Sequence, residues 1–402
     1  MRRTIELAAL LLAAAGPAAG DAAAQQPRFY YPAPPTAAVR VTRGVRFATV
    51  DTLHLAMDVY RPAARSAKSP ALVFYSQYWP SEGRPARESN DWLVSWARIA
   101  AAQGIVGIIP DIRAEPGTGN ATTPARALGD DFQRMIAFLA AHASEYGVDP
   151  NRIAVMASSG SVSAAFPAVE DPRQTAIKAA VMYYGSADVT SFRRDLPLLY
   201  VRAGMDSPSM NAAIDRLASL AVAQNAPITL LNHHSGQHGF EGRDDNAATR
   251  EVIEQTLQFV KRATAPAYQA AIRAGQLDAA AAAHLSTGNF HEASLVFAEL
   301  LKQRPADRQL RLSYGQALLA DEQYDAACAE LRRMTPPGEG SFQSILPGTR
   351  ACVLAGALDT AVVWLQGMPK AWVQSPYVGG LRADSVFAPL WGRADFQALF
   401  RP

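Results

Sequence analysis

Three residues far apart in this chain have the types and the order that nucleophilic catalysis requires. Ser159 lies in "MASSGSVSA", Asp206 ends the stretch "LPLLYVRAGMD", and His238 lies in "GQHGF". A serine hydroxyl is a poor nucleophile until a histidine accepts its proton. A carboxylate can hold the histidine ring in place and stabilise the imidazolium that forms. We therefore predict that Ser159, His238 and Asp206 act together as nucleophile, general base and orienting acid.

The turn around Ser159 departs from the pattern that usually exposes such a serine. The apolar run "RIAV" precedes it and the helix-compatible stretch "VSAAFPAV" follows, which predicts a strand, a sharp turn and a helix. The usual pattern is G-x-S-x-G, but Ala157 and Ser161 replace both outer glycines. Alanine and serine are the next smallest residues, so we predict an intact turn in which Ser159 has a strained, positive φ. A turn that has lost its activity and a plain loop of small residues are the alternatives.

An acyl-transfer site also needs hydrogen-bond donors for the developing oxyanion. One donor would be the backbone N–H of Gly160, the residue after the nucleophile. The second should come from the loop after "PALVFYS". Tyr78 is the preferred donor by position, and Gln77 is the alternative.

Two further assignments compete with this interpretation. Asp188 follows the preceding apolar run and could be the acid instead of Asp206. On spacing alone, His233, His234 and His238 could bind zinc. We predict no metal site, because the loop is not expected to be helical and no cysteine is nearby.

The elements that must position these residues alternate between apolar runs and amphipathic stretches from residue 41 to 263. The strand-like runs are "VRFATV", "LHLAMDVY", "PALVFYS", "GIVGIIP", "RIAVMA", "AAVMYYG", "LPLLYVRAG" and "PITLLNH". Helix-like stretches such as "DDFQRMIAFLAAHASEYG" and "SMNAAIDRLASLAVAQN" separate the middle and last runs. This alternation predicts an α/β fold, a mostly parallel sheet with helices on both faces. The first two runs are close enough to form an antiparallel hairpin at one edge.

These segments resemble the α/β-hydrolase fold. The segments "YGVDPNRIAVMASSGS", "AGMD" and "GQHGF" are similar to its nucleophile turn, acid loop and histidine loop. The compact spacing is similar to that of dienelactone-hydrolase-like proteins and small esterases, although dienelactone hydrolases carry cysteine where this chain has Ser159. Many members carry His-Gly-Gly where this chain has Ser76-Gln77-Tyr78. The resemblance implies a Ser-His-Asp triad that needs no cofactor. The short link between "MYYG" and "LPLLYV" leaves no room for a helical lid, so we expect an open cleft, walled partly by the N-terminal arm or the C-terminal helices.

The remainder, residues 264–402, is rich in alanine and reads as helix. Apolar positions recur there every 34 residues in four columns: Leu285, Leu319 and Val353; Phe290, Tyr324 and Leu358; Ala293, Ala327 and Ala361; and Phe297, Leu331 and Leu365. This period resembles tetratricopeptide repeats, and Gly315 and Pro305 match the small residue and the inter-repeat proline of that family. The resemblance implies stacked helix pairs with a peptide or protein partner. A helical bundle that serves stability alone is the alternative.

The N-terminus predicts export. Arg2 and Arg3 precede the apolar stretch "LAALLLAAAG", and Ala24 ends a small-residue cleavage site, so residues 1–24 read as a signal peptide. Residues 25–40 are proline-rich and predict an extended arm. We expect an exported protein, periplasmic or extracellular, with no membrane span in the mature chain. Cys328 and Cys352 are the only two cysteines; export permits a disulfide between them, but buried free thiols are favoured.

Together these features predict an exported serine hydrolase that cleaves carboxylic esters of small molecules or polymers through an acyl-enzyme. The net charge of +2 is too small to indicate a nucleic-acid partner. One alternative is a catalytically silent scaffold that binds a partner through its helical repeats. Another is a peptidase or amidase that uses the same triad.

Overall fold

The computed structural model describes residues 29–64, 68–76, 87, 90–113, 125–334, 342–368, 372 and 379–401. The chain divides into two compact units, a sheet unit (Met1–Thr264) and a helical unit (Ala265–Pro402). The predicted signal peptide and the predicted oxyanion donors Gln77 and Tyr78 lie outside the described residues.

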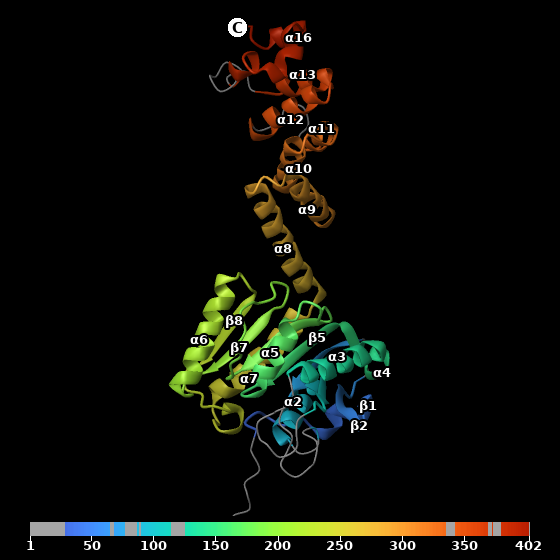
Figure 1. Ribbon diagram of the computed structural model, residues 1–402, viewed down its shortest axis with the longest axis vertical. Coiled ribbons are helices and arrows are strands. Elements are labelled where there is room, and N and C mark those ends of the chain that lie inside the picture. Colours follow the sequence, from blue (N-terminus) through green and yellow to red (C-terminus); the bar gives the residue numbers. More distant parts are fainter. Residues whose placement is uncertain are drawn as a thin grey trace, which may run out of the picture. The chain divides into compact units, whose positions relative to one another are not determined.

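The sheet unit is built on one eight-stranded sheet in the order β1-β2-β4-β3-β5-β6-β7-β8 (Figure 1). The strands are β1 (Val39–Val50), β2 (Leu53–Pro62), β3 (Ser69–Tyr75), β4 (Val106–Pro110), β5 (Val148–Ser158), β6 (Ile177–Tyr183), β7 (Leu198–Ala203) and β8 (Ile228–His233). All pairs from β4 to β8 are parallel, whereas β1–β2 and β2–β4 are antiparallel. The predicted parallel sheet and its antiparallel edge hairpin are confirmed. Every residue of β3 and β4 is buried, because a parallel strand covered on both faces needs a continuous apolar run.

Helices cover both faces of this sheet. They are α2 (Asp91–Ala102), α3 (Ala125–Ala141), α4 (Ala143–Tyr146), α5 (Ser161–Glu170), α6 (Pro208–Ala223) and α7 (Ala247–Ala263), with 3-10 turns η1 (Thr36–Ala38) and η2 (Phe240–Gly242). Helices α3, α5 and α6 pack on one face, and α2 and α7 pack on the other. Local capping fixes several helix starts. For example, the Ser207 hydroxyl accepts the Met210 N–H at the start of α6, and the Asn246 side chain accepts the Thr249 N–H at the start of α7.

The link between β6 and β7 contains no helix. This stretch, residues 184–197, is therefore free of an inserted lid, as the sequence predicted. Among the helices of the described residues, none combines the length and the apolar composition that crossing a bilayer requires.

The helical unit consists of helix pairs joined by short turns. Its helices are α8 (Pro266–Ser286), α9 (Phe290–Gln303), α10 (Arg308–Ala320), α11 (Tyr324–Arg332), α12 (Phe342–Leu354), α13 (Leu358–Gln366), α15 (Ala388–Trp391) and α16 (Ala394–Ala398), with 3-10 turns η3 (Gly379–Arg382) and η4 (Ser385–Phe387).

The predicted 34-residue period is visible in this unit. The second helix of each pair begins at Phe290, Tyr324 or Leu358, the three members of one predicted column. The alanine column, Ala293, Ala327 and Ala361, is 0% exposed throughout. At Gly315, an added Cβ would lie 2.5 Å from the side chain of Leu331, so α10 approaches α11 closely. The resemblance to tetratricopeptide repeats and the peptide or protein partner stay predictions.

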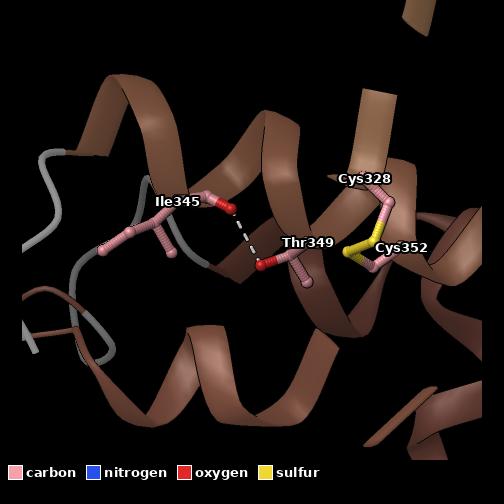
Figure 2. Close-up of a disulfide and its surroundings, with 4 residues drawn as sticks. All are labelled: Cys328, Ile345, Thr349 and Cys352. Carbon is pink, nitrogen blue, oxygen red and sulfur yellow. Dashed lines mark hydrogen bonds between the residues drawn. A yellow bond between two sulfur atoms is a disulfide. The ribbon is translucent and has the colours of Figure 1, made fainter. Parts of the chain in front are cut away.

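A disulfide joins Cys328 on α11 to Cys352 on α12, with 4.8 Å between their Cα atoms (Figure 2). The favoured prediction of free thiols was therefore wrong, although both residues are buried on helices as expected. The two helices lie against each other, and this packing brings together side chains that are 24 residues apart. In the turn beside the disulfide, the Thr349 hydroxyl donates to the carbonyl of Ile345 on the same helix.

We expect that replacing both cysteines with alanine lowers the free energy of unfolding of the helical unit by roughly 3 kcal/mol. The bond closes a loop of 24 residues, and cross-linking such a loop restricts the unfolded chain by about that amount. Urea titration of the full chain, followed by the helical signal in circular dichroism, measures the effect. Wild-type protein with a reductant should unfold like the variant, and equal midpoints with and without the reductant would contradict the prediction.

Candidate active site

The turn at Ser159 has the geometry expected of an exposed nucleophile. Strand β5 ends at Ser158 and α5 begins at Ser161, and Ser159 between them has a φ of 52°. This conformation is costly for a residue with a side chain and persists only where its surroundings enforce it. The N–H of Ser159 donates to the Tyr183 carbonyl (2.9 Å), and the Ser159 carbonyl accepts the Val162 N–H (3.0 Å). The predicted positive φ is confirmed.

The two positions that lack glycine fit their surroundings. Ala157 is 2% exposed and pairs with Tyr75 and Met182 on the neighbouring strands. Ser161 is 3% exposed at the start of α5. The turn depends instead on Gly185, which lies just after the end of the neighbouring strand β6. A Cβ added at Gly185 would lie 2.2 Å from the Ser159 carbonyl oxygen. Sequence reasoning missed this role of Gly185, and the signal for it was the glycine that ends "MYYG".

We expect Gly185→Ala to lower kcat/KM of any Ser159-dependent reaction by about 10²-fold, because a shift of about 1 Å at a catalytic turn has that effect. The clash is with backbone, so the turn must move. Gly129→Ala on α3 is the matched control, since an added Cβ there meets nothing within 4 Å. The measurement is the rate of covalent labelling by a fluorophosphonate. Equal labelling rates in the two variants would count against a tight turn.

Two hydrogen bonds join the three predicted catalytic residues. Ser159 Oγ lies 2.8 Å from His238 Nε2, and His238 Nδ1 lies 2.6 Å from Asp206 Oδ2. A carboxylate can only accept, so Nδ1 carries the proton toward Asp206 and Nε2 is left to accept from the serine hydroxyl. The Asp206 side chain is 8% exposed, and its second oxygen accepts the Ser207 N–H at 2.7 Å. Its carboxylate is thus held from both sides.

The loops that carry Asp206 and His238 are bonded to each other through their backbones. The His233 carbonyl accepts from the N–H groups of both Gly204 (2.8 Å) and Gly236 (2.9 Å), and the Gly236 carbonyl accepts the Met205 N–H (2.9 Å). An added Cβ at Gly204 would lie 2.3 Å from the His234 carbonyl oxygen, and one at Gly236 would lie 2.6 Å from the His233 ring. The two glycines therefore let the acid loop and the histidine loop pack closely, and the sequence analysis did not predict this role for Gly204.

The competing assignments place their residues elsewhere. Asp188 is exposed on the loop between β6 and β7, and Asp206 makes the bond to His238. The three histidines of the zinc alternative also separate. His233 is buried with Nε2 3.0 Å from Thr249 Oγ1, and His234 is exposed. Across the part of the chain that the structure describes, no group of three His, Cys, Asp or Glu residues is arranged to hold a metal.

Ser159 opens onto a cavity of about 260 Å³. Its described lining consists of Tyr75, Ser76, Asn90, Trp92, Leu93, Ser158, Ser159, Ser161, Tyr184, His238 and Gly239. The described residues of the N-terminal arm, 29–40, are not among this lining. Phe29 instead packs edge-on against Trp96, and the Tyr31 hydroxyl donates to Glu254 on α7. Sequence reasoning did not foresee Trp92 or Tyr184 in the lining, because neither belongs to a recognisable motif.

Of the predicted oxyanion donors, the described residues include Gly160. It directly follows Ser159 and precedes α5, with φ −58° and ψ −25°. The second donor was expected from the loop that follows β3. The structure describes this loop as far as Ser76, which lines the cavity.

A family model described as BD-FAE matches residues 57–233, which is less than half of the 402-residue chain. No curated protein matches the sequence. The sheet order, together with the strand–turn–helix at Ser159, is that of the α/β-hydrolase fold.

Similar solved structures include three esterases. Esterase Est22 with p-nitrophenol is 15% identical, with a TM-score of 0.46, over 56% of this chain and 82% of that protein. The thermophilic esterase Est2 from Thermogutta terrifontis is 20% identical, with a TM-score of 0.43, over 57% of this chain and 94% of that protein. Brefeldin A esterase, a bacterial homologue of human hormone-sensitive lipase, is 14% identical, with a TM-score of 0.46, over 56% of this chain and 78% of that protein.

Proposed function

We propose that this protein is an exported serine hydrolase that cleaves carboxylic esters through a Ser159–His238–Asp206 triad. The observation that carries the proposal is the continuous pair of hydrogen bonds from Ser159 Oγ to His238 Nε2 and from His238 Nδ1 to Asp206 Oδ2. The positive φ of Ser159 supports it, because that strain places the hydroxyl at the tip of a turn.

The mechanism follows from this geometry. His238 Nε2 takes the hydroxyl proton while Ser159 Oγ bonds to the ester carbonyl carbon, and Asp206 stabilises the imidazolium. The tetrahedral oxyanion would accept the Gly160 N–H and, by sequence position, the Tyr78 N–H. The bond from the tetrahedral carbon to the alkoxide oxygen then breaks, and the imidazolium donates its proton to that oxygen. The alcohol leaves and the acyl group stays bonded to Ser159 Oγ as the acyl-enzyme. Water attacks the acyl carbon as His238 takes one of its protons. That proton returns to Ser159 Oγ as the carboxylic acid leaves.

A fluorophosphonate tests the nucleophile directly. Such a probe should form one covalent adduct, and mass spectrometry of the digested protein should place it on Ser159. An adduct on another serine, or no adduct at all, would overturn the assignment. A silent scaffold would give no adduct on correctly folded protein.

The choice of esters over amides rests on the spacing of the triad residues, which resembles that of small esterases. A matched pair of substrates decides between them, namely the 4-nitrophenyl ester and the 4-nitroanilide of one acyl group. The quantity to compare is kcat/KM divided by the rate of uncatalysed hydrolysis of the same compound. We expect this ratio to be larger for the ester than for the anilide. The reverse order would favour the peptidase or amidase interpretation.

Export is supported by the disulfide between Cys328 and Cys352, because such bonds persist in oxidising compartments. Cleavage after Ala24 would leave a mature chain that begins at Gln25. The intact mass of protein recovered from the periplasm or the medium of an expressing bacterium measures the cleavage site. An uncleaved chain in the cytoplasm would contradict the proposal.

A further inference from the structure

Tyr184 occupies a strained position between the nucleophile strand and the acid strand. It follows β6, has a φ of 29°, and its N–H donates to the Val201 carbonyl at 2.8 Å. A bulky residue at positive φ is an outlier that the surrounding structure must enforce, and such outliers concentrate at functional sites. Its neighbour Tyr183 accepts the Ser159 N–H through its carbonyl, so Tyr184 lies beside the nucleophile turn.

The ring of Tyr184 lies against the ring of His238. The two ring centroids are 4.8 Å apart, with 57° between the ring planes. Tyr184 is 3% exposed, whereas the His238 side chain is 37% exposed, and both residues line the cavity. The tyrosine is therefore a buried wall beside an imidazole that is otherwise open to the cavity.

A buried anchor holds this wall in place. The Tyr184 hydroxyl donates to Glu241 Oε2 at 2.9 Å, and Glu241 is 0% exposed on η2, three residues after His238. The ring of Phe240 also packs edge-on against Tyr184, with centroids 5.6 Å apart. Burial raises the pKa of the Glu241 carboxyl to about 8, so at neutral pH this anchor is mostly uncharged. The support it gives to the imidazole is therefore steric and not ionic.

We propose that Tyr184 is a positioning residue for His238, whose ring keeps the two imidazole nitrogens directed at Ser159 and Asp206. Without this ring, the imidazole could turn toward the cavity and lose one or both hydrogen bonds. Glu241 acts one step further away, by fixing the tyrosine. This inference rests on the proposed function, since it concerns the same triad.

Three variants of the full chain separate the parts of this arrangement. Tyr184→Leu removes the ring and should lower kcat by at least tenfold, because a base displaced from its hydrogen bond loses most of its effect. Tyr184→Phe keeps the ring but loses the hydrogen bond to Glu241. We therefore expect its kcat to lie between those of wild type and Tyr184→Leu. Phe47→Leu is the matched control. It removes a buried ring of the same unit that is not part of the cavity lining, and it should leave kcat unchanged.

A spectroscopic readout distinguishes positioning from loss of stability. The His238 Nδ1 proton, bonded to Asp206 at 2.6 Å, should give a low-field proton NMR signal in wild type and in Phe47→Leu. In Tyr184→Leu this signal should be lost or shifted upfield, and Tyr184→Phe should restore it in part. A Tyr184→Leu protein that keeps both the signal and the wild-type kcat overturns the inference.

The Ser159→Ala protein tells the two failures apart. If it is inactive while Tyr184→Leu behaves like wild type, the triad stands and the role of Tyr184 falls. If Ser159→Ala keeps wild-type activity, the proposed function itself falls.

Discussion

Replacing Ser159 with alanine should lower kcat for ester hydrolysis by about 10⁶-fold, the loss seen when the nucleophile of such a triad is removed. The hydroxyl oxygen that meets His238 Nε2 at 2.8 Å is the atom that must bond to the substrate carbon. Without it, no acyl-enzyme can form. Labelling by a fluorophosphonate should disappear in the same variant.

The neighbouring serines provide the controls for this prediction. Ser158→Ala and Ser161→Ala should each keep most of the activity and of the labelling, with losses below about tenfold. Both residues line the cavity, but it is Ser159 whose hydroxyl meets the histidine. A Ser159→Ala protein that still hydrolyses esters at more than a hundredth of the wild-type rate would falsify the nucleophile assignment.

Replacing Asp206 with asparagine should lower kcat by about 10⁴-fold while the protein stays folded. Asp206 accepts the Nδ1 proton of His238 at 2.6 Å. An asparagine side chain can instead present its NH₂ group to Nδ1, which favours the tautomer with a proton on Nε2. That tautomer cannot accept the hydroxyl proton of Ser159.

Asp188→Asn is the matched control for the acid, because Asp188 was the alternative that the sequence left open. It is exposed on the loop after β6, so we expect a change in kcat of less than about threefold. Steady-state kinetics on one ester, with thermal unfolding of each variant, measures both effects. A larger loss in Asp188→Asn than in Asp206→Asn would reverse the assignment of the acid.

The amino-acid sequence by itself was sufficient for the architecture of the sheet unit. Each predicted strand is present. The signal was clearest for β3 and β4, because a strand that is buried on both faces of a sheet is apolar along its whole length and leaves a visible run. The helices of the second unit were equally visible, since their buried positions recur with a 34-residue period and the alanine column at Ala293, Ala327 and Ala361 is fully buried. Such patterns are local and periodic, so they need no knowledge of distant contacts.

The order of serine, acid and histidine in the sequence also pointed to the candidate site. It favoured Asp206 and kept Asp188 as the fallback, since both follow apolar runs and nothing local states which strand end faces the histidine loop. In the tertiary structure it is Asp206 that meets His238, because backbone bonds from His233 and Gly236 join the loop of Asp206 to the histidine loop.

Other features depended entirely on contacts between residues far apart in the chain. Gly185 is required because its strand end lies against the Ser159 carbonyl, and the partner that makes it indispensable is 26 residues away in the sequence. Cys328 and Cys352 pair because α11 and α12 pack against each other. Tyr184 meets both His238 and the buried Glu241 only when the end of β6 and the segment after β8 come together. Residue type and spacing determined which chemistry this chain could support. The packing of its strand ends decided which side chains meet, because steric fit and hydrogen-bond geometry depend on contacts between residues that are distant in the sequence.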